Sequence, residues 1–111
     1  MKFLLMIHGD ETAWDELPPA VQQARREQYG AVAGRSEVLR ASELGPTSSA
    51  TTVRVHDGNT LVTDGPYAET REALGGIFLI DAESMDAALA LAKQLPPSAG
   101  IEVRPVYGSE S

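Results

Sequence analysis

The sequence predicts an α+β fold in which two helices pack on one face of a sheet. Residues 3–7 and 77–80 are apolar without interruption, which is typical of central strands covered on both faces. Residues 17–32 and 85–95 instead repeat their apolar side chains at helical spacing. Between these elements, residues 50–65 contain two β-rich runs around a turn signal, so a hairpin is expected there.

Length and composition indicate one domain without nucleic-acid or membrane partners. The chain has 111 residues, and we expect a single domain at residues 1–107 followed by a frayed tail at 108–111. A net charge of −7 leaves no basic face for phosphates or an anionic membrane. No apolar run approaches the about 20 residues that span a bilayer, and cysteine is absent. We therefore expect a cytoplasmic protein without disulfides or thiolate chemistry.

The first strand should turn alternate side chains to opposite faces of the sheet. One face would receive Phe3, Leu5 and Ile7, and the other Leu4, Met6 and His8. Proline is tolerated in a first helical turn, so Pro18-Pro19 is expected to open the first helix, which Gly34 would end. The buried stripe of this helix is expected to comprise Leu17, Val21, Ala24, Gln28 and Val32.

After a short strand in "EVLRASEL", the hairpin turns within Asp57-Gly58-Asn59. The two-residue loop is either Asp57-Gly58 or Gly58-Asn59, and both place Val62 on the face of Val53 and Val55. The register is otherwise open. Asp64 lies two residues beyond Val62, so an unbroken strand carries it onto the same apolar face.

The second half of the chain repeats the pattern of strand, helix and strand. Gly75-Gly76 leads into the strand "IFLIDA" and is expected to mark a bulge or a close backbone approach. Ser84 is a good N-cap for the second helix, and Pro96-Pro97 ends it. The last strand is "IEVRPVY", where Pro105 favours an edge position. The stripe expected for the second helix is Met85, Ala88, Leu89, Ala92 and Leu95.

This order is the split βαβ pattern of a ferredoxin-like sandwich with an extra hairpin. Two helices can cover only one face of its sheet. The other face would carry Leu4 and Met6 with either Ile77 and Leu79 or Phe78 and Ile80. An uncovered apolar face of that size predicts a partner, most simply a second copy of the chain, so we expect a homodimer.

Three stretches carry a family resemblance over nearly the whole length. They are "MKFLLMIHGDE", "TTVRVHDGNTLVTDGPYAETREALGGIFLID" and "IEVRPV". The chain resembles the YCII-related proteins, and within them the branch named for a DGPF motif. The segment "DGPYAETREALGG" differs from the usual form of that branch by Tyr67 in place of phenylalanine.

The resemblance implies a dimeric α+β barrel in which two sheets close around a shared interior. It also implies a histidine and aspartate pair in a pocket, and chemistry of the isomerase, lyase or oxygenase kind on small organic molecules. In the wider group that histidine lies on the first helix, whereas "PPAVQQARREQYGAVAG" contains none. Some members of the branch resemble partners of extracytoplasmic-function sigma factors.

Asp64 has two interpretations. Before glycine and proline, an aspartate forms an Asx-type turn in which its carboxylate accepts hydrogen bonds from nearby backbone N–H groups. Alternatively, it is a carboxylate at the rim of a pocket that abstracts a proton next to a carbonyl. The expected place of Asp64 on an apolar face is the observation that supports the second interpretation.

His8 would then be the substitute catalytic partner of Asp64, at the end of the first strand, or a histidine satisfied by local hydrogen bonds. Tyr67, Arg71 and Trp14 are candidate substrate-binding residues. Arg71 could hold a carboxylate, although it also suits a solvated turn, and Trp14 also suits helix packing. We expect neither a metal nor another cofactor, since "HGDE" lacks a recognised ligand spacing and no phosphate loop occurs.

Two functions from different classes fit these residues. One is a cofactor-independent isomerase or lyase acting by acid–base chemistry on a small cyclic or aromatic carbonyl compound in the barrel interior. The other is a non-catalytic dimer that binds a ligand or a protein, in association with an extracytoplasmic-function sigma factor.

Overall fold

A computed structural model of the chain describes residues 1–108. Residues 109–111 of the expected tail therefore lie outside the described part of the chain. None of the helices in residues 1–108 combines the length and apolar character required to cross a membrane. The elements follow one another as β1 (Lys2–Gly9), α1 (Glu11–Asp15), α2 (Pro19–Ala33), β2 (Val38–Glu43), a 3₁₀ turn η1 (Thr47–Ser49), β3 (Thr51–His56), β4 (Asn59–Asp64), β5 (Ala73–Asp81), α3 (Met85–Ala92) and β6 (Gly100–Pro105).

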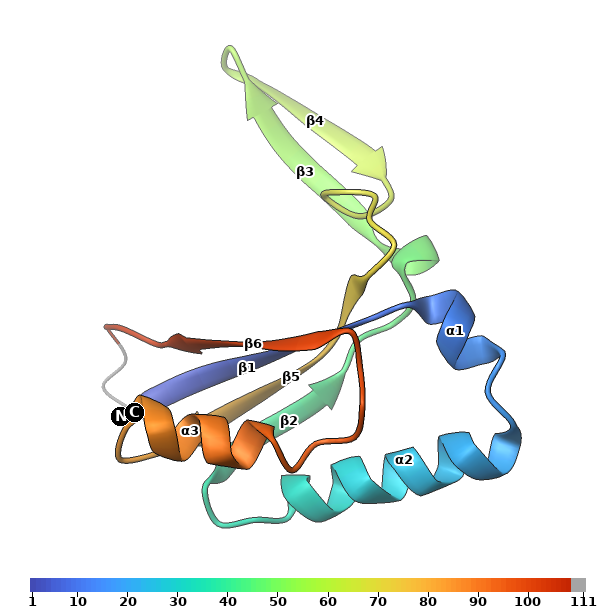
Figure 1. The fold of residues 1–111 in the computed structure, drawn as a ribbon. Coiled ribbons are helices and arrows are strands. Elements are labelled where there is room, and N and C mark those ends of the chain that lie inside the picture. The colour runs from blue at the N-terminus through green and yellow to red at the C-terminus, as the bar shows by residue number, and fades with distance from the viewer. Residues whose placement is uncertain (109–111) are drawn as a thin grey trace.

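The main sheet has the strand order β2-β5-β1-β6, and all neighbouring strands are antiparallel. Figure 1 shows α2 and α3 together on one side of this sheet. The predicted α+β class is confirmed. The strand order is also the one expected for a ferredoxin-like sandwich.

The core lies between the sheet and the two helices. Leu5 pairs with Phe78 and Phe3 with Ile80, and all four side chains are buried. Successive side chains of a strand point to opposite faces, so the residues between them lie on the uncovered face. There, Leu4 pairs with Leu79, and Met6 with Ile77. We call this surface the open face. The predicted alternation of β1 is confirmed, and Ile77 and Leu79 are the residues of β5 that share its open face.

The expected stripe of α2 is largely wrong. Val32 is buried, whereas Val21, Ala24 and Gln28 are exposed. The helix contacts the core through its C-terminal end, with Tyr29 and Ala33 beside Val32. Its N-terminal part extends past the sheet (Figure 1). Helical periodicity identifies an apolar stripe but not how much of the helix overlaps the sheet.

In α3 the predicted N-cap is confirmed, because the Ser84 hydroxyl accepts a hydrogen bond from the Ala87 amide at 3.1 Å. The predicted stripe needs correction. Leu91 is buried, whereas Met85 and Leu89 are exposed. Ala88, Ala92 and Leu95 are buried as predicted, so the docked face is rotated only toward Leu91, by roughly 50° around the helix. The sequence of α3 is apolar almost throughout, so either face could have been the buried one. The residues that pack inward are Ala88, Leu91, Ala92 and Leu95.

The hairpin of β3 and β4 forms a second sheet of its own. Its loop is Asp57-Gly58, with φ angles of 50° and 78°, which is the left-handed geometry of a tight hairpin turn. This settles which of the two predicted loops is used. Val53 pairs with Val62, so the shared face predicted for the valines is confirmed. Figure 1 shows the hairpin projecting away from the main sheet on the side opposite α2 and α3.

Candidate functional site

His8 lies at the end of β1 on the open face, beside a bulge in β5. Ile7 pairs with Gly76 and His8 with Leu74, so Gly75 is the extra residue, as the Gly75-Gly76 pair predicted. The imidazole Nε2 lies 3.7 Å from a carboxylate oxygen of Glu102 on β6. Both side chains are partly exposed. The imidazole of His8 therefore faces a carboxylate of the neighbouring strand.

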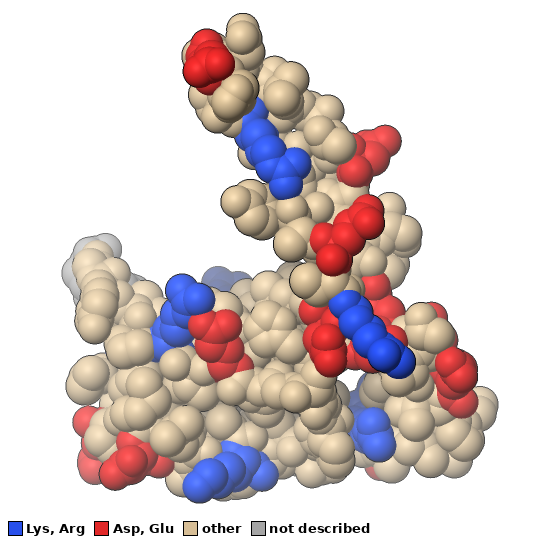
Figure 2. All heavy atoms as spheres, turned by 45° about the horizontal axis from the view of Figure 1, so that its top comes forward, with Lys and Arg blue, Asp and Glu red and all other residues tan. Residues whose placement is uncertain are grey.

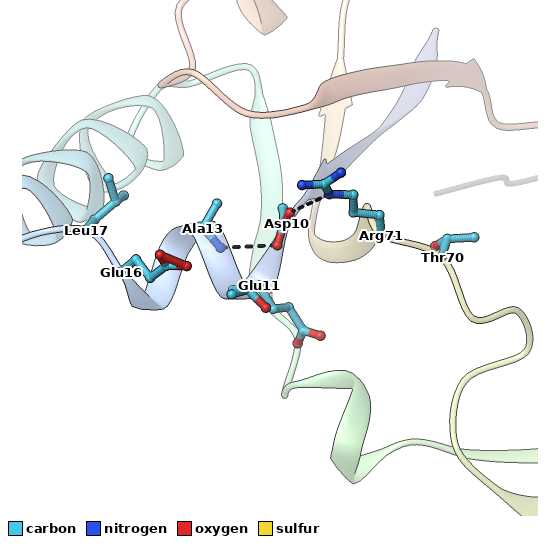
Figure 3. A pocket seen from close by; sticks show the side chains of 8 residues that line it. Asp10, Glu11, Ala13, Glu16, Leu17, Thr70 and Arg71 are labelled. Carbon is cyan, nitrogen blue, oxygen red and sulfur yellow. Dashed lines mark hydrogen bonds and ion pairs between the residues drawn. The ribbon is translucent and has the colours of Figure 1, made fainter.

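Asp10 follows directly and holds two elements together. One oxygen of its carboxylate accepts a hydrogen bond from the Ala13 amide at 3.1 Å, which caps α1. The other accepts a hydrogen bond from Nε of Arg71 at 3.3 Å (Figure 3). The Ala13 amide first, and Arg71 to a smaller extent, hold the pKa of Asp10 below its ordinary value. Arg71 is therefore placed at the end of β1.

Glu11 ties α1 to the base of the hairpin. Its carboxylate accepts hydrogen bonds from the Thr47 hydroxyl at 2.5 Å and from the Thr47 amide at 2.9 Å. The hydroxyl contributes most to lowering the pKa of Glu11, and the amide adds to it. Thr47 begins η1, which leads into β3. Glu11 is thus ionised, and its carboxylate is already engaged by Thr47.

An open hollow of about 630 Å³ lies beside these carboxylates. Figure 3 shows Glu16 and Leu17 on one side of it and Arg71 with Thr70 on the other. Asp64, Tyr67 and His8 do not line this hollow. Because Asp10 and Glu11 are engaged in structural hydrogen bonds, the hollow offers few free polar groups to a ligand.

Asp64 ends β4, opposite Thr51, and its side chain is exposed. Within residues 1–108 its carboxylate takes part in no hydrogen bond or ion pair, so the Asx-type turn is not formed. Gly65 shapes the segment instead, with a φ of 109°. Its amide donates to the Ala50 carbonyl at 2.8 Å, and its carbonyl accepts from the Thr52 hydroxyl at 2.7 Å.

Tyr67 packs back onto the hairpin. The guanidinium of Arg54 lies 4.9 Å from the centre of its ring and donates to the Tyr67 carbonyl at 2.7 Å. The phenol is otherwise largely exposed. Arg54 and Leu61 pair across the two strands, on the hairpin face opposite Val53 and Val62. The segment after Asp64 therefore covers part of that face and leaves the valines bare.

Comparison with known proteins establishes the family. Residues 1–109 match the model of the YCII-related domain. The chain belongs to this family. An uncharacterised protein of Rhizobium meliloti (strain 1021) is 34% identical over 119 residues, covering 96% of this chain and 92% of that protein. The match includes both the main sheet and the hairpin, so the hairpin lies within the YCII-related domain.

In this YCII-related domain, Trp14 lies apart from the other candidate residues. Its ring stacks with the guanidinium of Arg26, 5.3 Å from the ring centre, and its carbonyl accepts a hydrogen bond from Gln22 at 2.8 Å. Both partners belong to α2. These contacts are those of a residue that packs α1 against α2.

The YCII-related domain thus separates the candidates between the end of β1, the hairpin and, for Trp14, the contact of α1 with α2. His8 with Glu102, and Arg71 with Asp10, meet where β1 ends, and Asp64 with Tyr67 lies on the hairpin. Residues 1–108 contain no buried polar side chain and no cluster of three metal-ligating residues. Glu102, Asp10 and Glu11 were not singled out as catalytic candidates. The alternation in "IEVRPVY" separates Glu102 from Ile101 and Val103, but nothing in the sequence places it beside His8.

Proposed function

We propose that this protein is a member of the DGPF branch that forms a homodimer by turning the two open faces toward each other. The enclosed interior would bind a small cyclic or aromatic carbonyl compound and move a proton on it, as an isomerase or lyase does, without a cofactor. The observation that supports this most directly is the pairing of His8 with Glu102 at 3.7 Å beside an apolar sheet surface.

The open face supplies the two properties that such a site needs. Leu4, Met6, Ile77 and Leu79 form an apolar surface for a ring, and each is only partly covered in the single chain. His8 ends this surface, and an imidazole exchanges protons near neutral pH. Glu102 would orient the imidazole. Together these residues would serve as the general base and its partner.

Asp64 would be the second acid–base group. Its carboxylate has no partner within residues 1–108, so it is available to a substrate. Tyr67 and Arg71 follow it in sequence and would orient the substrate, Arg71 by binding a carboxylate in exchange for Asp10. Trp14 is better assigned to packing, given its contacts with α2.

The test is proton exchange on a panel of cyclic and aromatic carbonyl compounds in D₂O, followed by NMR. We expect the wild-type protein to accelerate exchange of the proton next to the carbonyl. His8→Gln should lower the rate by about 10²-fold or more, since that is the usual contribution of a general acid–base group. His56→Gln is the matched control, because His56 also lies near a carboxylate, at 3.3 Å from Asp57, but at the hairpin tip. Equal rates for both variants would contradict the proposal.

A non-catalytic dimer that binds a ligand or a protein, associated with an extracytoplasmic-function sigma factor, is the second candidate. The exposed position of Asp64 favours it, since a catalytic carboxylate is usually enclosed. Asp64→Asn separates the two. It keeps the shape of the side chain, so it should abolish turnover in an enzyme and leave binding unchanged in a binding protein.

A further inference from the structure

The β3–β4 hairpin carries a row of exposed valines on one face. Val53, Val55 and Val62 are 62%, 72% and 67% exposed. The pairing of Val53 with Val62 places them on the same side, and Val55 follows two residues after Val53. We call these three residues the valine face. A run of exposed β-branched side chains on a two-stranded sheet is typical of a surface that another molecule covers.

Residues 1–108 leave the valine face bare. Tyr67 and Arg54 pack on the other side of the hairpin. Hydrogen bonds of Gly65 with Ala50 and Thr52 close the base of the hairpin, and those of Thr47 with Glu11 connect it to α1. The projecting hairpin also enlarges the molecule. The radius of gyration is 15.8 Å, against about 13 Å for a compact chain of this length.

We propose that the hairpin is an intersubunit arm whose valine face packs against a second copy of the chain. This rests on the dimer proposed above. The arm projects on the side of the sheet opposite the helices, which is the side of the open face (Figure 1). A second copy that covers the open face would therefore lie alongside the arm. Burying the three valines adds apolar contact that the sheet alone does not provide.

Unpaired charges of opposite sign support a second copy as the occupant. Arg40 lies on the open face, where it pairs with Leu79 across the strands. Neither its guanidinium nor the Asp64 carboxylate makes a hydrogen bond or ion pair within residues 1–108. Asp64 lies on the same side of the hairpin as the valine face, because it pairs with Thr51. In Figure 2 a basic side chain lies along the hairpin, with acidic side chains at its tip and near its base.

The arm gives the site a composite character. Asp64 shares the face that contacts the partner, so its carboxylate would lie at the subunit boundary. His8 lies on the open face that the partner covers. The acid–base pair would therefore depend on dimerisation for its enclosure, which accounts for the absence of buried polar side chains within residues 1–108 of a single chain.

Two neighbouring positions provide a matched test. Val62 and Leu61 are adjacent, 67% and 53% exposed, and lie on opposite faces of the hairpin. We expect Val62→Asp to raise the dimer dissociation constant by about tenfold or more, since it places a charge in an apolar contact. Leu61→Asp should leave it within about threefold. Sedimentation equilibrium measures both constants, and circular dichroism checks that both variants stay folded.

Thiol labelling tests the same contact without a charge. Because the chain has no cysteine, a single introduced cysteine reports on its own position alone. In the dimer, Val62→Cys should react with a soluble thiol reagent at least about tenfold more slowly than Leu61→Cys. Equal labelling rates, together with equal dissociation constants for the two aspartate variants, would contradict the proposal that the hairpin contacts a second copy.

A third variant separates the arm from the dimer itself. Leu79→Glu places a charge at the centre of the open face and should dissociate a dimer formed through that face. If Leu79→Glu dissociates the protein whereas Val62→Asp does not, the proposed role of the hairpin is contradicted and the proposed dimer is supported. If the wild-type protein sediments as a monomer throughout, both fail.

Discussion

The main sheet and the hairpin are built from similar residues but have opposite surroundings. In β1 and β5, alternate side chains are buried against the helices, and Leu5 and Ile80 are fully enclosed. In β3 and β4, valines in the same alternation remain exposed. The pattern of a strand therefore tells which residues share a face, but not whether the chain itself covers that face.

The difference has a functional meaning. The sheet has a buried core on the face that the helices cover, whereas a two-stranded hairpin alone is marginal in water. Within residues 1–108, the valine face of the hairpin is exposed and the open face of the sheet is only partly covered. The candidate residues His8 and Asp64 lie on these two surfaces. The proposed site therefore belongs to the parts of the molecule that need a partner. The main sheet with α2 and α3, which we call the body, can have its stability measured separately.

Truncating one apolar side chain in each region should give the largest contrast. Leu5→Ala removes a fully buried side chain and should lower the free energy of unfolding by about 3 kcal/mol. Val55→Ala removes an exposed one and should change it by less than about 0.5 kcal/mol at concentrations where the protein is monomeric. Urea unfolding followed by circular dichroism measures both. Losses of similar size would mean that the hairpin is integrated into the core.

A smaller effect is expected where the body holds the hairpin base. Glu11→Gln replaces a carboxylate that accepts two hydrogen bonds from Thr47 and should cost about 1 kcal/mol at neutral pH. The lowered pKa of Glu11 fixes the sign of the pH dependence. The contribution is present above the ordinary carboxyl pKa of 4.5 and is lost as the pH falls through the lower folded value.

Urea midpoints between neutral and acidic pH measure this contribution. The difference between wild type and Glu11→Gln should shrink as the pH falls below 4.5. Glu16→Gln is the control, because Glu16 lines the same hollow but its carboxylate has no hydrogen bond or ion pair within residues 1–108. A constant difference across the pH range would show that the hydrogen bonds to Thr47 do not depend on the charge of Glu11.

Local patterns predicted the strands and helix ends because short-range chemistry determines them. The alternation of β1, the N-cap at Ser84 and the valine register across the hairpin all follow from residues a few positions apart. The same alternation placed His8 on the open face and Asp64 beside the valines. The candidate positions were thus predictable as members of a face.

Their surroundings were not predictable, because they depend on distant residues. Asp10 and Arg71 meet across 61 positions of sequence, and Glu11 and Thr47 across 36. The short helix α1 went unpredicted because its five residues are fewer than two helical turns and offer no periodic pattern. The stripe of α2 was only partly right because the sequence does not show how much of a helix overlaps the sheet. In α3, Leu91 is buried in place of Met85 and Leu89, because a helix that is apolar almost throughout does not show which side docks.

Two glycine substitutions, one in α2 and one in the hairpin, should give the smallest difference in stability between the main sheet and the hairpin. Gly30 lies inside α2, and an added Cβ would meet no atom within 4 Å. Gly30→Ala should therefore raise the free energy of unfolding by about 0.5–1 kcal/mol, since alanine loses less backbone entropy in a helix. Gly58 also has free space but a φ of 78° in the hairpin turn. Gly58→Ala should strain that turn and leave the unfolding of the body unchanged, because the core makes no use of the hairpin. Urea unfolding gives the first effect, and amide hydrogen exchange across β3 and β4 gives the second. A global destabilisation by Gly58→Ala would show that the hairpin and the sheet unfold as one unit.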